Sequence, residues 1–161
     1  MPQRVFFNFD FDRDYLRAKI VRDAWEFHGK GETLPFYDPG GFEEAIRAAG
    51  SIQNWLDGHL RECSVLAVLV GYESYKKPWV LESVRKSIEL NLGILAIDIH
   101  GICDPHAGTD VSHGLCPLDL LRLSMTKYRR YEWIRHDGEH NIAAWVDYAA
   151  SVVRPNFYRY P

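Results

Sequence analysis

The chain contains 161 residues, of which 47% are hydrophobic and 25% are charged, so it can bury a sizeable core and is not expected to be disordered. Its formal net charge of −3 argues against a general electrostatic binder of nucleic acid, because such domains carry an excess of basic residues. Three scattered cysteines without a CxxC pair argue against a disulfide framework and a structural zinc site. Because no leader and no membrane-spanning apolar run is visible, we expect one cytoplasmic domain over residues 1–161 and no membrane partner.

Short apolar runs, typical of buried strands, alternate along the chain with segments whose apolar residues recur at helical spacing. In chain order the predicted elements are a strand at 4–9, a helix at 14–28, a strand at 34–37, a helix at 42–48, a helix that opens at Ser51, a strand at 64–70, a helix from Pro78 to about Leu90, a strand at 94–99, a strand at 131–134 and a helix at about 139–153.

Helix caps and prolines fix several of these boundaries. Ser51 is expected to cap its helix, and Pro78 suits the first residue of a helix because its missing N–H would have no partner there. Asn91 is the expected C-cap of the same helix. Pro35 places the weak strand at 34–37 on an edge of the sheet. Residues 101–126, rich in Gly, Pro, Asp and His, are predicted to form a long irregular insertion.

Strands that alternate with helices predict an α/β fold with a mainly parallel sheet covered on both faces, a three-layer sandwich. Five strands favour the flavodoxin-like order 2-1-3-4-5. Ligands of such folds bind beyond the carboxyl ends of strands one and three, where the direction of winding changes. The sequence therefore points to two loops, 10–13 and 71–78, and to the helix that follows them.

Acidic, aromatic and basic side chains gather in these two loops. A carboxylate beside aromatic walls can stabilise positive charge on a ribose while a ring stacks on a base, which is the chemistry of glycosidic cleavage. The candidate binding residues are Phe6, Phe9, Asp10, Arg13, Tyr72, Ser74 and Trp79. These residues also have structural explanations: the loops can simply be solvated, and Trp79 can be a packing residue. Glu82, in the first turn of the following helix, is a further acidic candidate, but a carboxylate there also interacts favourably with the helix dipole.

Two other chemistries fit the pattern less well. The insertion holds His100, His106 and His113 near two cysteines, but their spacing matches no usual zinc pattern, so we expect no metal and no cofactor. A phosphoacceptor receiver domain needs an aspartate at the end of strand three, where this chain has Gly71.

The sequence resembles the TIR-like family of the bacterial Thoeris anti-phage defence system. The matching segments, in the same order, are Arg4–Asp10, Ile20–Trp25, Val65–Gly71, Trp79-Val80, Lys86–Glu89, Gly93–Ile99, Gly114–Asp119 and Tyr131–Trp133. The resemblance implies a TIR fold and an enzyme that cleaves the nicotinamide–ribose bond of NAD, its substrate, to make a linear or cyclic ADP-ribose signal. It also implies a viral trigger protein and self-assembly into a homo-oligomer.

By the same resemblance Phe6 lines the nucleotide pocket and Trp79 opens the helix of the active-site glutamate. That glutamate falls four residues after the tryptophan in the family, where this chain has Ser83, and Glu82 lies one residue earlier. One residue is about 100° of helical rotation. Either the helix is out of step and Glu82 is catalytic, or another acid such as Glu73 or Asp10 acts, or the chain is an inactive module that binds a nucleotide or assembles with partner TIR proteins.

Overall fold

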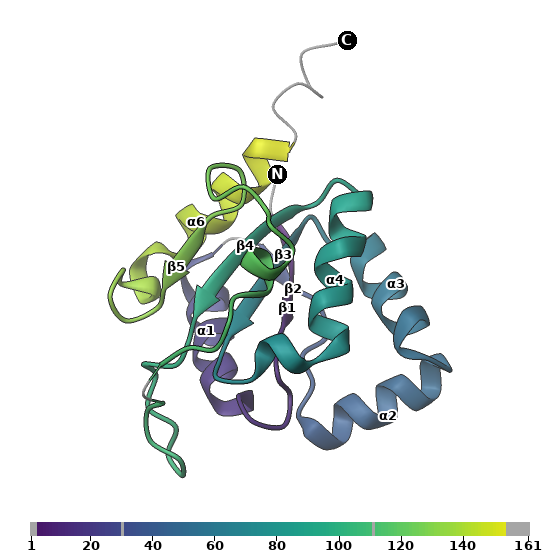
Figure 1. Ribbon diagram of the computed structural model, residues 1–161, viewed down its shortest axis with the longest axis horizontal. Helices are drawn as coiled ribbons and strands as arrows, with labels where there is room; N and C mark the ends of the chain where they lie inside the picture. Colours follow the sequence, from purple (N-terminus) through teal and green to yellow (C-terminus); the bar gives the residue numbers. More distant parts are fainter. Residues whose placement is uncertain (1–2, 30, 111, 154–161) are drawn as a thin grey trace.

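Five parallel strands form one sheet in the order β2-β1-β3-β4-β5 in the computed structural model, which describes residues 3–29, 31–110 and 112–153 (Figure 1). The strands are β1 (Arg4–Asn8), β2 (Glu32–Thr33), β3 (Val65–Val70), β4 (Gly93–Asp98) and β5 (Arg130–Glu132). The predicted α/β flavodoxin-like fold and its strand order are confirmed.

Helices cover both faces of this sheet, as right-handed crossovers between parallel strands require (Figure 1). The helices are α1 (Tyr15–His28), α2 (Pro39–Ala49), α3 (Ile52–Glu62), α4 (Pro78–Glu89), α5 (Pro117–Leu120) and α6 (Gly138–Val153), with a 3-10 turn η1 (Ser74–Lys76) before α4. On one face α1 packs against α6, and on the other α3 packs against α4, with α2 outside α3. None of the described helices is long and apolar enough to cross a membrane.

The central strand β3 is the most buried element, with all six of its residues inaccessible to solvent. It pairs with β1 through Val65–Val68 and with β4 along its full length. Continuous burial explains why its sequence VLAVLV shows no polar alternation.

Prolines and caps shift two predicted boundaries in the first half of the chain. The strand predicted at 34–37 is wrong, because pairing stops after the Leu34 N–H donates to Val5 O (2.9 Å), and Pro35 has no N–H to continue it. The edge position is nevertheless right. The helix predicted at 42–48 begins at Pro39, because the Asp38 carboxylate caps it by accepting from Gly41 N (2.6 Å).

Other caps agree with the sequence pattern more closely. Ser51 caps α3 by accepting from Asn54 N (3.0 Å), and Pro78 is the first residue of α4, as predicted. The C-cap of α4 is Leu90 rather than Asn91, which follows it in a left-handed conformation with φ 57°. The predicted strand at 131–134 begins and ends earlier, as β5. The described part of the insertion is irregular apart from the single turn of α5.

Two glycines give a paired test of the packing. A Cβ on Gly93, at the start of β4, would lie 2.6 Å from the backbone oxygen of Ala149 in α6, whereas a Cβ on Gly58 in α3 would meet no atom within 4 Å. We expect Gly93→Ala to lower the free energy of unfolding by about 1–3 kcal/mol, because the backbones must separate. Gly58→Ala should raise it by about 0.5–1 kcal/mol, since alanine has the higher helix propensity. Urea unfolding of both variants measures the difference, and equal midpoints would contradict the close approach of β4 and α6.

Candidate functional site

The loops that follow β1 and β3 meet at the carboxyl edge of the sheet. The Lys77 ammonium lies 3.7 Å from a carboxylate oxygen of Asp10, and the Arg13 guanidinium lies over the Tyr72 ring at 5.1 Å from its centroid. Four charged and aromatic residues from two distant stretches of sequence therefore come together. Three of them, Asp10, Arg13 and Tyr72, are candidate binding residues from the sequence.

Trp79 ties the start of α4 to the end of β1. Its indole N–H donates to Phe9 O (2.9 Å), and its own carbonyl accepts from the Asn8 side-chain amide (3.0 Å). The half-buried ring packs on Phe42, with centroids 4.8 Å apart, and on Phe11. These contacts give Trp79 a structural role beside the predicted binding role.

The other two candidate wall residues are in the core. Phe6 is 1% exposed, stacked on His59 with centroids 5.1 Å apart and in edge contact with Trp55. Phe9 is fully buried against Phe11. A ligand could reach either ring only if its neighbours moved aside, so their part in a nucleotide pocket stays a prediction.

Ser74, another candidate binding residue, stabilises the loop after β3 through hydrogen bonds to the backbone. Its hydroxyl accepts from Gly71 N (2.8 Å) and donates to Leu69 O (3.1 Å), and the residue is fully buried. Both capacities of the hydroxyl are therefore used by the backbone, so a role for Ser74 in ligand binding also stays a prediction.

A buried ion cluster lies beneath these loops. Arg17, which is 1% exposed, donates to Asp14 (2.9 Å) and to the insertion carbonyls of Ile102 (3.0 Å) and Gly108 (2.7 Å). The Asp110 carboxylate faces Arg17 at 3.5 Å and bonds Arg13 at 2.7 Å. The cluster thus anchors the first part of the insertion onto α1 and the β1 loop.

Burial raises the pKa of Asp14 from 3.8 to about 6, against the opposing effect of the hydrogen bond and charge of Arg17. Asp14 lies beside Gly71, where an added Cβ would come within 2.0 Å of a carboxylate oxygen. Any side chain at position 71 would therefore displace this carboxylate, which explains why a glycine follows β3.

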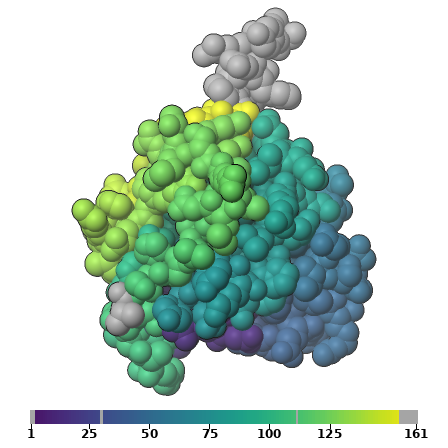
Figure 2. Space-filling view, in the orientation of Figure 1, coloured from purple at the N-terminus to yellow at the C-terminus, as the bar shows by residue number. Residues whose placement is uncertain are grey.

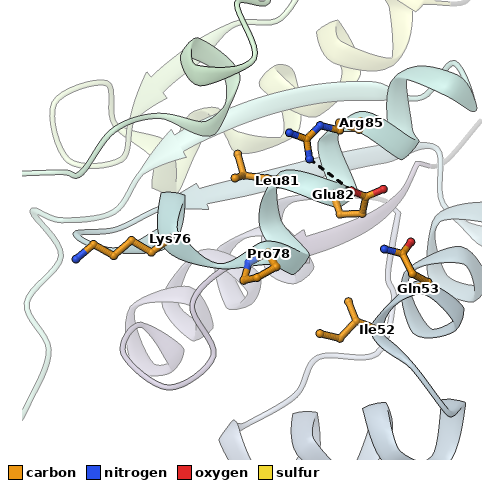
Figure 3. Close-up of a pocket in the computed structure, with 7 residues that line it drawn as sticks. All are labelled: Ile52, Gln53, Lys76, Pro78, Leu81, Glu82 and Arg85. Atoms are coloured by element: carbon orange, nitrogen blue, oxygen red, sulfur yellow. Dashed lines mark hydrogen bonds and ion pairs between the residues drawn. The ribbon is translucent and has the colours of Figure 1, made fainter.

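Glu82 lines an open groove between α3 and α4, of about 370 Å³, which we call the α3–α4 groove (Figure 3). Its described lining residues are Ile52, Gln53, Lys76, Pro78, Leu81, Glu82 and Arg85, and include neither Phe6 nor Trp79. The Glu82 carboxylate forms an ion pair with Arg85 at 3.4 Å (Figure 3). Lys76 lies at the far end of the groove from Gln53 (Figure 3).

The neighbouring candidates for the acid face elsewhere. Ser83 is fully buried, and its hydroxyl donates to Val80 O (2.7 Å), as expected for a residue turned about 100° from Glu82. Glu73 pairs with Lys76 at 3.6 Å on the loop before α4. Asp10 is 1% exposed beside Lys77. Of the four candidates, Glu82 is the one that lines the α3–α4 groove.

A second groove, of about 490 Å³, lies between the β3–α4 loop and the insertion, and we call it the insertion groove. Its lining residues are Tyr72, Tyr75, Lys76, His113, Gly114, Leu115, Cys116, Asp119 and Leu120. Gly114 N donates to Gly71 O (3.0 Å), which holds this wall against the end of β3. The green segment in Figure 2 shows the insertion spread over this face of the molecule.

His113 lies between two acceptors at the edge of the insertion groove. One ring nitrogen is 2.6 Å from Gly114 O, and the other is 3.7 Å from a carboxylate oxygen of Asp98 at the end of β4. Burial raises the pKa of Asp98, and the nearby His113 and His100 lower it. Within residues 3–29, 31–110 and 112–153, no group of three His, Cys, Asp or Glu residues could hold a metal ion.

Several residues that line the two grooves are not among the site residues predicted from the sequence. Arg85 carries a signal, because residues three apart on a helix are neighbours and Glu82 therefore predicts an ion pair there. No sequence pattern places Gln53 or Leu115 in a groove, because this depends on how α3 and the insertion pack against the rest of the fold.

The family model described as "Thoeris protein ThsB, TIR-like domain" matches residues 6–103, from β1 through β4 and into the insertion. The chain belongs to this TIR-like ThsB family. A relative from Bacillus cereus (strain MSX-D12), named "Putative cyclic ADP-D-ribose synthase ThsB1", is 29% identical over 193 aligned positions, which cover 91% of this chain and 100% of the relative. The likeness of this chain to the ThsB family thus extends past the matched domain, and the resemblance drawn from the sequence is confirmed.

The raised pKa of Asp14 predicts a pH dependence of stability. The folded chain binds this proton more tightly than the unfolded chain, so the contribution of Asp14 is most favourable at low pH and is lost as the pH rises from about 4 through about 6. Relative to Asp14→Asn, the wild type should lose on the order of 2–3 kcal/mol of unfolding free energy between pH 4 and pH 7. Chemical denaturation of both proteins across this range gives the difference, and parallel pH profiles would refute it.

Proposed function

We propose that this TIR-like ThsB protein is an enzyme that cleaves the nicotinamide–ribose bond of NAD and makes an ADP-ribose-derived nucleotide signal, linear or cyclic, in anti-phage defence. Membership of the ThsB family supports this, and so does the name of the relative that aligns over its full length. We further propose that the protein acts in the cytoplasm, that a viral protein triggers it and that copies of it assemble.

The observation that carries the catalytic part of the proposal is Glu82 in the α3–α4 groove. When nicotinamide leaves with the electron pair of the glycosidic bond, positive charge develops on the ribose ring, and a carboxylate on that face stabilises it. Water then adds to the ribose carbon and loses a proton, or an adenine nitrogen of the same molecule adds and closes a ring. Lys76 and Arg85, in the same groove, supply positive charge for the pyrophosphate.

The Glu82–Arg85 ion pair is weak in this arrangement, because both side chains are partly exposed and the separation is 3.4 Å. A bound pyrophosphate competes for Arg85 and so leaves the Glu82 carboxylate available to the ribose. The apolar side chains of Ile52 and Leu81 give the groove walls that exclude part of the water around the reacting bond.

A second candidate function rests on Ser83. The residue at the family's glutamate position is a buried serine bonded to Val80 O, so no acid acts from that place. A TIR-like module that has lost catalysis would bind a nucleotide in the same groove or assemble with partner TIR proteins. Such a module would need the groove but not the charge of Glu82.

Replacing Glu82 separates the two functions. We expect Glu82→Gln to reduce nicotinamide release from NAD by about 100-fold or more, because the neutral amide cannot stabilise the developing positive charge. Glu89→Gln is the matched control, since Glu89 is an exposed acid on the same helix outside the groove, and it should keep wild-type activity. Purified protein is assayed with NAD in the presence and absence of extract from infected cells.

Two results would favour the binding module instead. One is the absence of nicotinamide release by the wild type under both conditions, while a nucleotide still binds. The other is full cellular protection by Glu82→Gln, which would show that the charge of Glu82 is not part of the mechanism.

A further inference from the structure

The two grooves at the carboxyl edge of the sheet share one residue. Lys76 lies at the end of the α3–α4 groove and also lines the insertion groove. It belongs to the short turn η1, and its side chain extends away from Glu82 (Figure 3). The lysine therefore stands where one groove passes into the other.

Each groove is large enough for one half of a dinucleotide. Ligand pockets of a few hundred cubic ångströms hold small organic molecules, and these grooves measure about 370 and 490 Å³. The ligand of the proposed enzyme consists of two nucleotides joined through a pyrophosphate. A cation at the junction of two grooves suits that shape, because phosphate charge is concentrated at the middle of the molecule.

The walls of the insertion groove differ from those around Glu82. Tyr72 and Tyr75 present aromatic rings, and Leu115 and Leu120 present apolar side chains that are 57% and 44% exposed. Such exposed apolar residues beside polar groups are typical of ligand sites, and an aromatic ring can stack on a purine. His113 and Asp119 add polar groups that can bond the edge of a base or a ribose hydroxyl.

From these observations, and resting on the proposed function, we propose that the insertion groove is the adenylate subsite of this protein. The adenosine half of the dinucleotide lies between the β3–α4 loop and the insertion, Lys76 bonds the pyrophosphate, and the nicotinamide half lies beside Glu82. The insertion then determines which base the protein accepts, and the α3–α4 groove holds the bond that breaks.

The present partner of Lys76 does not oppose this role. Its ammonium is 3.6 Å from Glu73, and the two side chains are 55% and 37% exposed, so the pair is weak and exchangeable. The ammonium also lies 5.7 Å from the centre of the Tyr75 ring. A small rotation of the lysine is enough to move it from Glu73 to a phosphate, since its stem is flexible.

Binding of the separate halves tests the assignment without any cleavage. AMP and nicotinamide mononucleotide are titrated by calorimetry into the wild type and into Leu115→Asp, a change on an exposed side chain that leaves the fold intact. We expect Leu115→Asp to weaken AMP binding about tenfold or more, because the carboxylate replaces an apolar contact with the adenosine, and to leave binding of the mononucleotide unchanged. Lys76→Ala should weaken both.

Two matched controls isolate the groove from general charge effects. Met125→Asp adds the same charge to an exposed apolar residue of the insertion outside the groove, and Lys19→Ala removes an exposed lysine from α1. Both should bind AMP as the wild type does. If AMP does not bind the wild type, or binds Leu115→Asp as tightly, the subsite assignment is overturned.

The same variants distinguish this assignment from the proposed function. If NAD is never cleaved but AMP binding depends on Leu115 and Lys76, the enzymatic proposal fails and the subsite stands. If NAD is cleaved and Leu115→Asp has an unchanged KM, the adenylate subsite is wrong and the enzyme stands.

Discussion

Burial of β3 is the constraint on which the rest of the structure depends. All six of its residues are inaccessible, with β1 paired on one side and β4 on the other, so both faces of the sheet must be covered by helices. Parallel neighbours need crossovers, which return every strand in the same direction, and the right hand of the crossover decides which face of the sheet its helix covers. The loops after β1 and β3 therefore end at one edge, where the chain of α1 leaves to one face and that of α4 to the other. The proximity of Asp10 to Lys77, and of Arg13 to Tyr72, follows from this topology.

The insertion is tied to that edge by charges rather than by regular structure. Arg17 is buried in a helix and satisfies two carbonyls of the insertion, while Asp14 and Asp110 balance its charge. A buried cation without these partners would be costly, so the insertion and α1 stabilise each other. Later in the insertion, the Gly114 N–H donates to the Gly71 carbonyl. This hydrogen bond holds His113 and Leu115 beside the β3–α4 loop. An irregular segment thus becomes one wall of a groove.

The enzyme and the inactive binding module differ in whether Glu82 can act in place of an acid at position 83, one residue further along α4. Position 83 of α4 faces the core, where a serine can bond the preceding turn, and position 82 faces the gap beside α3, where a glutamate is partly solvated. A carboxylate at position 83 would be buried, and burial favours its neutral form. The acid at position 82 keeps access to solvent and to Arg85 in its groove, which suits a group that must stay charged beside a ribose.

The sequence by itself determined the strand order, the start of α4 at Pro78 and the two loops of the site, because apolar runs, prolines and caps are local properties. It also brought Asp10, Arg13 and Tyr72 to one edge through the topology alone. Only the tertiary structure decided that Glu82 faces a groove and Ser83 does not, that Phe6 and Phe9 line neither groove, and that Lys76 lines both. Those facts depend on how α3 packs against α4 and how the insertion folds back, and such contacts between distant segments leave no periodic signal in the chain.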